Sequence, residues 1–224
     1  MPPLTAASDA LLPMLIERPP LLFRKLVPGG IFRVPAATRD GRKEVYLTFD
    51  DGPIPEVTPW VLDQLDAYGI KATFFMVGDN ARKYPDVARE VLRRGPAVGN
   101  HTMHHVQGAG MATRSYLRDV QEAAELLDTS LFRPPHGWLR PAQARALRSR
   151  YTLVMYDLVT RDYSYRLDAD RVFANVRRYA RPGAIIVFHD SLKSRDRILT
   201  ALPRSLEWLL EQGYTFGLLT DLKH

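Results

Sequence analysis

The sequence predicts an α/β fold in which parallel strands form a sheet or a barrel covered by helices. Short apolar runs rich in β-branched and aromatic residues alternate along the chain with longer segments of helical periodicity. Strict alternation of this kind requires parallel strands joined by right-handed crossovers. Several runs, such as Thr152–Tyr156 and Ala184–Phe188, are apolar on both faces, as strands of a buried parallel sheet are.

Seven segments are predicted strands and six are predicted helices. The strands are expected at Val45–Phe49, Ala72–Val77, Ala97–Gly99, Leu131–Arg133, Thr152–Tyr156, Ala184–Phe188 and Thr215–Leu219. The helices are expected near residues 56–68, 80–94, 114–128, 141–149, 169–180 and 198–212. The third helix carries Tyr116, Val120 and Ala123 on one face, as an amphipathic helix requires. The last ends at Gly213, a natural helix stop.

The first 43 residues do not join this alternation. Prolines and glycines interrupt them, notably at Pro19-Pro20 and Pro28-Gly29-Gly30. We therefore expect residues 1–43 to form a helix and an extended arm packed on a domain of residues 44–224. A chain of 224 residues is long enough to bury one substantial core.

The composition excludes several classes of protein. No run approaches the roughly 18 uninterrupted apolar residues of a membrane-spanning helix. The N-terminus lacks the basic start of a secretory signal, so we expect a cytoplasmic location, and an exported or trimmed form fits the same sequence. The net charge of +6 is spread over helix faces rather than clustered, which argues against nucleic-acid binding. Cysteine is absent, so any metal must be held by His and carboxylate side chains. The oligomeric state is left open.

Two adjacent carboxylates, Asp50 and Asp51, end an apolar strand and precede Gly52-Pro53. Neighbouring side chains of a strand point in opposite directions, so both aspartates can face one site only if the backbone turns there. Gly52 permits such a turn. The C-terminal edge of a parallel strand is where α/β enzymes place catalytic groups. The alternative is a structural strand end in which one aspartate caps the next helix.

His101 and His105 are four residues apart. On one helical turn both imidazoles would reach a common point, as two metal ligands must. The alternative is a pair of exposed histidines near a helix start. His104 would point elsewhere and is expected to take no part.

Three further segments place polar residues just beyond predicted strands. In Arg133–Trp138, two prolines and a glycine stiffen a loop that could present a backbone N–H to a developing oxyanion. Residues 156–163 carry acids beyond a buried strand. His189 ends the most apolar strand, where it could protonate a leaving group near neutral pH. A stiff turn, an ordinary polar loop and a satisfied core histidine are the respective structural alternatives.

The order and spacing of these segments resemble the polysaccharide deacetylases, which form carbohydrate esterase family four and share the NodB-homology domain. The resemblance rests on TFDDGP at 48–53, HTMHH at 101–105, RPPHG at 133–137, the acidic segment ending near 162 and the strand ending in His189. It covers about residues 44–220. It implies a deformed (β/α) barrel of about seven parallel strands, with the active site at the C-terminal strand ends.

The resemblance also implies a metal-dependent hydrolase that removes N-acetyl groups from an N-acetylated hexosamine glycan or oligosaccharide. By motif, Asp51, His101 and His105 would hold a divalent metal, Zn²⁺ first and Co²⁺, Ni²⁺ or Mn²⁺ as other candidates. The metal would polarise the acetamide carbonyl and lower the pKa of a bound water, the nucleophile. O-deacetylation of acetylated xylan, cyclic amide hydrolysis and a catalytically silent carbohydrate-binding module stay open as alternatives.

The remaining roles follow from the same motifs. Asp50 would be the general base, and His189 the general acid oriented by Asp162. Arg133 would organise the loop that follows it. Lys71, from its place beside the ATFF segment, is a candidate to support Asp50 through a salt bridge.

The RPPHG loop would bind the oxyanion and the substrate through the backbone N–H of His136, beside Pro135. His136 stands where the family commonly has Tyr, a change that a backbone role survives. In the acidic segment the usual DxxDW pattern becomes VTRDY, with Val159 and Tyr163 as the changed positions. This wall normally faces the acetyl methyl, so the identity of the acetylated substrate is the expectation most affected.

Overall fold

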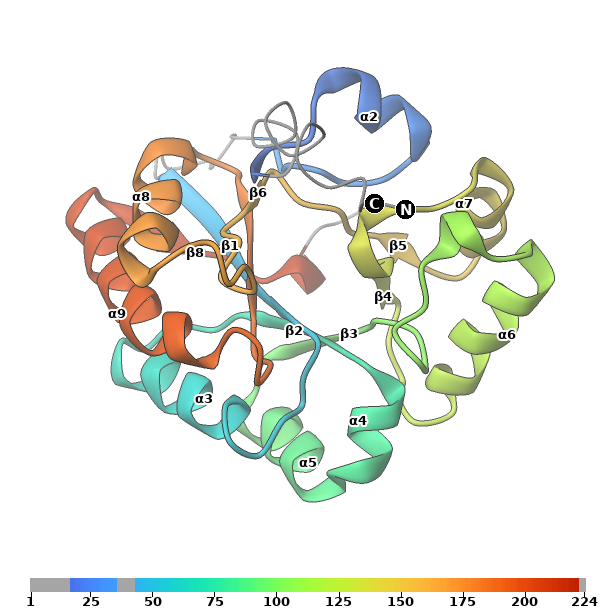
Figure 1. Ribbon diagram of the computed structural model, residues 1–224, viewed down its shortest axis with the longest axis horizontal. Coiled ribbons are helices and arrows are strands. Elements are labelled where there is room, and N and C mark those ends of the chain that lie inside the picture. Colours follow the sequence, from blue (N-terminus) through green and yellow to red (C-terminus); the bar gives the residue numbers. More distant parts are fainter. Residues whose placement is uncertain (1–16, 36–42, 222–224) are drawn as a thin grey trace, which may run out of the picture.

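The computed structural model describes residues 17–35 and 43–221, in which eight parallel strands form one curled sheet (Figure 1). The strands are β1 (Lys43–Asp50), β2 (Thr73–Met76), β3 (Ala97–Asn100), β4 (Leu131–Phe132), β5 (Thr152–Leu153), β6 (Leu158–Val159), β7 (Ile185–His189) and β8 (Tyr214–Phe216). Seven of them follow the order β5-β4-β3-β2-β1-β7-β6, and β8 pairs with the start of β1. The predicted deformed (β/α) barrel is confirmed.

Helices cover the outer face of this sheet (Figure 1). They are α3 (Thr58–Ala67), α4 (Gly78–Lys83), α5 (Pro85–Arg94), α6 (Thr113–Ala124), α7 (Pro141–Leu147), α8 (Ala169–Tyr179) and α9 (Arg195–Glu211). One further helix, α2 (Leu21–Leu26), lies apart from this layer. The single helix predicted near 80–94 is two helices. Tyr84 leaves the helical region with φ −124° and ψ 61°, because Pro85 disfavours a helical residue before it and lacks an N–H to donate.

One strand was not predicted. In β6, Leu158 and Val159 pair with Ile186 and Val187 of β7 and are buried. The strand is two residues long and lies between polar residues, so its sequence has the pattern of a loop. Its existence depends on the neighbouring strand, which supplies the hydrogen-bond partners.

The hydrophobic core occupies both faces of the sheet. Under the helices, Phe49 stacks on Phe74 and Phe188 with ring centroids 5.0 and 6.0 Å apart. Successive side chains of a strand point to opposite faces, so Phe75 belongs to a second cluster on the other face. This two-sided burial is what makes the strands apolar throughout.

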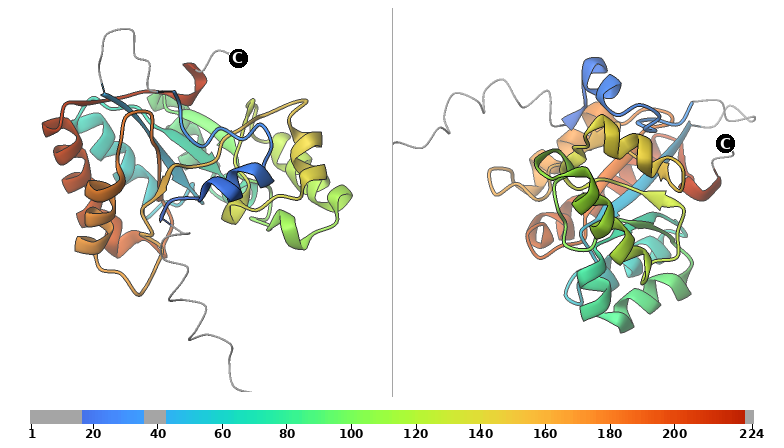
Figure 2. Two further views of the ribbon diagram at one scale, coloured as in Figure 1. Left: turned by 90° about the horizontal axis from the view of Figure 1, so that it is seen from above. Right: turned by 90° about the vertical axis from the view of Figure 1, so that its right-hand side faces the viewer.

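Helix α2 and the arm that follows it close the gap in the curled sheet. Ile31 pairs with Val154, just beyond β5, and Arg33 pairs with Ala184, just before β7. Figure 2 shows this segment in blue between the side of the barrel that carries α8 and α9 and the side that carries α6 and α7. The remainder of the predicted N-terminal segment, residues 1–16 and 36–42, lies outside the described residues. Within the described ranges, no helix is both long and apolar enough to cross a membrane.

Candidate active site

A cavity of about 820 Å³ opens at the C-terminal ends of the strands. Its wall includes residues from the loops after β1, β3, β4, β6 and β7 and from α2. Of the predicted site residues, the following line it: Asp50, Asp51, His101, His105, Arg133, His136, Tyr163 and His189. The barrel thus gathers segments that lie far apart in the sequence.

The backbone turns sharply between the two aspartates. Asp50 is the last residue of β1, and Asp51 has a left-handed φ of 81°. This conformation, unfavourable for a residue with a side chain, brings both carboxylates to the same cavity. Asn80 helps to hold the turn, since its Nδ2 donates to the carbonyl oxygen of Asp51 at 2.7 Å.

Asp190 also supports this turn, a role that was not predicted from the sequence. Its Oδ1 accepts a hydrogen bond from the N–H of Gly52 at 3.1 Å, and its Oδ2 accepts one from the Thr58 hydroxyl at 2.6 Å. Burial raises the pKa of Asp190 to about 8. A Cβ on Gly52 would lie 2.0 Å from Asp190 Oδ2, so only glycine fits there. In the sequence, the only mark of this role is that an acidic residue directly follows His189.

Asp51, His101 and His105 form a set of metal-ligand type. The Nε2 atoms of His105 and His101 lie 3.0 and 3.8 Å from Asp51 Oδ1. One ligand atom from each residue lies within 4.8 Å of the others. A carboxylate oxygen and two imidazole nitrogens suit a divalent transition metal and leave coordination positions open. The residues therefore fit the ion that the sequence predicted.

The prediction that His101 and His105 share a helical turn was wrong. The segment is a loop after β3, with left-handed φ values of 65° at Thr102 and 54° at His105. These reversals, and not the pitch of a helix, bring the two imidazoles together, with ring centroids 5.2 Å apart. His104 points elsewhere, as predicted, and its Nδ1 lies 2.6 Å from Asp119 Oδ2.

The electrostatics of this set favour metal binding. His101 Nδ1 lies 2.8 Å from the carbonyl oxygen of Arg133, which assigns the proton to Nδ1 and leaves the Nε2 lone pair free. Burial lowers the pKa of His101 to about 4, so the ring is neutral near pH 7. Burial alone would raise the pKa of Asp51, but the hydrogen bond with His105 and the adjacent histidines hold it well below its usual range. A neutral imidazole and an ionised carboxylate are the protonation states a metal requires.

Arg133 holds Asp50 from within the barrel. Its guanidinium donates to Asp50 Oδ1 and to the Thr48 hydroxyl, each at 2.7 Å, and its Nη2 donates to the carbonyl oxygen of Met155 at 2.9 Å. Its plane lies over Phe75, with Cζ 4.1 Å from the ring centroid. Arg133 is only 2% exposed, so it forms a buried ion pair that fixes one oxygen of Asp50.

The predicted support of Asp50 by Lys71 was wrong. Lys71 Nζ instead donates to Asp66 Oδ1 at 3.3 Å and to the carbonyl oxygen of Arg94 at 2.7 Å, on the surface. The reason is the strand direction. Lys71 precedes β2, and Asp50 is the register partner of Phe75, near the far end of that strand. Arg133 occupies the place that Lys71 was expected to fill.

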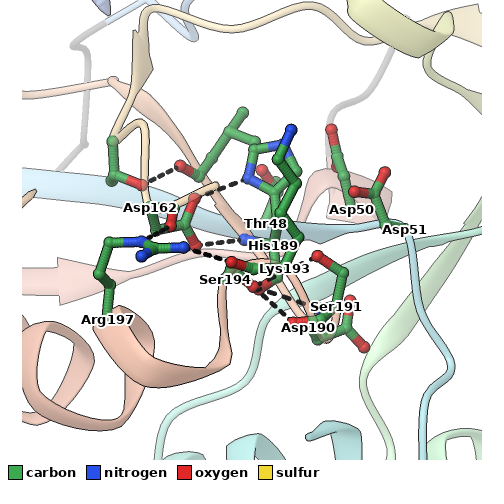
Figure 3. A network of polar contacts seen from close by, with 12 residues as sticks. Thr48, Asp50, Asp51, Asp162, His189, Asp190, Ser191, Lys193, Ser194 and Arg197 are labelled. Carbon is green, nitrogen blue, oxygen red and sulfur yellow. Dashed lines mark hydrogen bonds and ion pairs between the residues drawn. The ribbon is translucent and has the colours of Figure 1, made fainter. Parts of the chain in front are cut away.

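His189 and Asp162 form a second polar pair. His189 Nδ1 lies 2.8 Å from Asp162 Oδ1, and the backbone N–H of His189 donates to Asp162 Oδ2 at 2.7 Å. Figure 3 shows Asp162 on one side of His189 and Asp50 and Asp51 on the other. Asp50 and His189 are register partners on adjacent strands β1 and β7. Burial alone would lower the pKa of His189, but Asp162, with Asp51 and Asp50, raises it to about 9.

The RPPHG loop presents the backbone of His136. A short 3₁₀ turn, η2 (Pro135–Gly137), contains His136 with φ 59° and ψ 4°. Among the described residues, none accepts a hydrogen bond from the His136 N–H. Burial and the neighbouring His105 lower the pKa of the His136 imidazole, whose ring centroid lies 4.8 Å from that of His105. Pro135, predicted to contact substrate, is buried and is not part of the cavity wall; it shapes the turn instead.

Comparison with known proteins shows the family to which this chain belongs. Residues 37–155, more than half of the chain, match the sequence profile of the polysaccharide deacetylases. The chain belongs to the polysaccharide deacetylase family. It is accordingly a hydrolase, of the class that cleaves carbon–nitrogen bonds other than peptide bonds.

Relatives support this over nearly the whole chain. A peptidoglycan-N-acetylglucosamine deacetylase of Bacillus cereus is 32% identical over 212 residues, which cover 90% of this chain and 97% of that protein. A chitooligosaccharide deacetylase of Bradyrhizobium sp. is 30% identical, over 81% of this chain and 91% of that protein. The crystal structure of the Bc1960 peptidoglycan N-acetylglucosamine deacetylase, in complex with 4-naphthalen-1-yl-N-oxidanyl-benzamide, superposes with a TM-score of 0.81 at 28% identity. That match covers 90% of this chain and 95% of the other.

Backbone strain marks the active site of this polysaccharide deacetylase. In the described part of the chain, five non-glycine residues have a positive φ: Asp51, Thr102, His105, His136 and Arg161. Each lies in one of the motif segments. Left-handed conformations of such residues are unfavourable and persist only where the surroundings impose them. The fold therefore holds the loops in the shapes that the site requires.

Proposed function

We propose that this polysaccharide deacetylase hydrolyses the N-acetyl group of an N-acetylhexosamine unit in a glycan or oligosaccharide. The observation that carries the proposal is that one cavity brings a His₂Asp set together with Asp50 and His189 on adjacent strands. Asp50 is paired with Arg133, and His189 is paired with Asp162. The named activities of the relatives are deacetylation of N-acetylglucosamine in peptidoglycan and deacetylation of chitooligosaccharides. They support an amide of an amino sugar as the substrate.

We propose Zn²⁺ as the ion held by Asp51, His101 and His105. Such an ion supplies Lewis acidity, which polarises a carbonyl group and makes water more acidic. Zn²⁺ is commonly bound by imidazole nitrogen and carboxylate oxygen in open catalytic sites, and the donor set here has that composition.

In this proposal, Asp50 removes the proton from the attacking water. Arg133 occupies its Oδ1, which leaves Oδ2 to accept that proton at the cavity wall. The ion pair also keeps the carboxylate in one orientation, so that the base is preorganised and need not be reoriented during the reaction. Because the base and the metal ligand are consecutive residues, the turn at Asp51 sets their spacing.

Two other groups stabilise the oxyanion and protonate the departing amine. The His136 N–H donates a hydrogen bond to the oxygen that becomes negative when water adds to the amide carbon. His189, held at Nδ1 by Asp162, presents Nε2 to the amine and protonates it as the C–N bond breaks. His189 is suited to this task because its pKa of about 9 keeps it protonated at neutral pH.

Measuring acetate release from metal-loaded protein on chitin oligomers and on acetylated xylan, side by side, tests the proposal. We expect release from the chitin oligomers and a much lower rate on the xylan ester. Release from the xylan alone would show that the enzyme acts on O-acetyl groups instead. The absence of release from any N-acetylated glycan would refute the assignment.

A further inference from the structure

Asp119, on α6, is a buried carboxylate that takes no part in the chemistry proposed above. Its Oδ1 accepts hydrogen bonds from the backbone N–H groups of Met103 and His104, at 2.8 and 3.1 Å. Its Oδ2 accepts one from Nδ1 of the His104 ring, at 2.6 Å. Asp119 is only 8% exposed, so these bonds are shielded from water. A side chain of α6 thus binds the loop between His101 and His105, which carries two of the proposed metal ligands.

The first N–H groups of α4 bind the carbonyl groups of the same loop. The N–H of Gly78 donates to the carbonyl oxygen of Thr102 at 2.9 Å. The N–H of Asp79 donates to the carbonyl oxygen of Met103, also at 2.9 Å. In the described part of the chain, no backbone carbonyl accepts the N–H of Met103. A buried N–H without a partner is costly, so Asp119 supplies an acceptor that the main chain does not.

The two histidines of the metal set differ in how their rings are held. Nδ1 of His101 lies 2.8 Å from a backbone carbonyl oxygen, and His101 is only 2% exposed. The side chain of His105 is 34% exposed, and its ring has one polar contact among the described residues, between Nε2 and Asp51. No group outside the metal set therefore orients the His105 ring by a hydrogen bond. Its place depends on its backbone, and the two residues before it are those that Asp119 binds.

We propose that Asp119 is a positioning residue that sets the place of His105 in the metal site by holding the backbone at residues 103 and 104. This inference rests on the proposed function, because it assumes that the His₂Asp set binds Zn²⁺. His105 has a left-handed φ of 54°, a conformation that persists only where the surroundings impose it. Removing a group that orients a metal ligand typically weakens metal binding by about 10–100-fold. Asp119 would act in this way through the main chain rather than through the ring.

The affinity of metal-free protein for Zn²⁺, measured by calorimetry, tests this role. The proteins compared are wild type, Asp119→Ala and Asp119→Asn. Asparagine keeps a side-chain oxygen that can accept both backbone N–H groups, whereas alanine keeps none. Glu122→Ala is the matched control, because Glu122 lies on the same helix and carries the same charge, but pairs with Arg82 at the surface. Thermal unfolding without metal shows which variants are folded at the temperature of the titration.

Asp119→Ala should weaken Zn²⁺ binding by about tenfold or more, Asp119→Asn should recover most of the loss, and Glu122→Ala should leave the affinity unchanged. The same Asp119→Ala change is then made in His105→Ala protein. There it should have little further effect, because the side chain that Asp119 positions is gone. An equal loss in both backgrounds would show a general loosening of the fold and would overturn the inference. An unchanged affinity in Asp119→Ala would overturn it too.

A second substitution covers the case in which Asp119→Ala does not fold. Asp119→Glu keeps the charge but moves the carboxylate by one methylene group, and it should weaken Zn²⁺ binding in wild-type protein and not in His105→Ala protein. If wild-type protein binds no Zn²⁺, the proposed metal site itself fails. If wild-type protein binds Zn²⁺ and the Asp119 variants bind it equally well, only the positioning role fails.

Discussion

Replacing Asp162 with asparagine should separate the proton donor from its support. Asp162 is buried and contacts His189 through both the ring and the backbone N–H. Asparagine keeps the size and can still accept the backbone hydrogen bond, but it removes the negative charge. Asp162 is the largest of the contributions that raise the pKa of His189, ahead of Asp51 and Asp50.

The magnitude follows from the pKa of His189. At a pKa of about 9, about 90% of His189 is protonated at pH 8. Without Asp162, the pKa loses the largest of the contributions that raise it, while burial still lowers it; at the ordinary value of 6.5, about 3% is protonated at pH 8. The direction of the effect follows from the role of His189 as a proton donor, because the enzyme loses activity as the pH rises through the pKa of its proton donor. We therefore expect kcat/KM to fall about 30-fold at pH 8. The alkaline limb of the plot of kcat/KM against pH should shift to lower pH by about two units.

The assay is acetate release from a chitin oligomer at pH values between 6 and 10, with wild-type and Asp162→Asn protein. The loss should shrink as the pH is lowered, because His189 regains its proton. An alkaline limb at the same pH in both proteins, with a pH-independent loss, would refute the assignment of His189 as the donor controlled by Asp162. Saturating metal in both samples ensures that metal occupancy does not differ.

Three further substitutions test other parts of the site. Arg133→Met leaves Asp50 buried and unpaired, so chemical denaturation should show a loss of about 3–5 kcal/mol of unfolding free energy, part of which the double variant with Asp50→Asn recovers. Lys71→Ala should leave kcat/KM unchanged and stability within about 0.5 kcal/mol, because its ion pair is exposed; a large loss of activity would contradict this. Gly52→Ala should lower the melting temperature and weaken metal binding in calorimetry, since its Cβ collides with Asp190.

The sequence predicts the class of fold and the edge at which the chemistry lies, for a physical reason. Alternating strands and helices leave only parallel topologies, and parallel strands bring their C-terminal ends to one edge. Asp50 and His189 illustrate this, since they are 139 positions apart in the chain and adjacent in the register of β1 and β7. The family motifs then predicted the roles of the site residues, which the spacing of these residues along the chain did not determine.

Features that depend on tertiary contacts were not predictable in this way. The pairing of His101 with His105 comes from two left-handed residues, which no helical spacing encodes. Asp190 acts on a glycine 138 residues earlier in the chain, and the two-residue strand β6 exists because β7 pairs with it. The edge-to-face contact of Phe23 with Trp138 requires α2 to lie against the loop after β4, and α2 belongs to a segment that the motifs do not cover.

The central claim is that one cavity combines a metal held by Asp51, His101 and His105 with Asp50 as the base. The most direct test is acetate release from a chitin oligomer by wild-type and Asp50→Asn protein, with bound Zn²⁺ measured in the same samples. The account predicts one Zn²⁺ per chain in both proteins and a loss of about 10²–10⁴-fold in rate for the variant. Equal acetate release by the two proteins at equal metal content would contradict it.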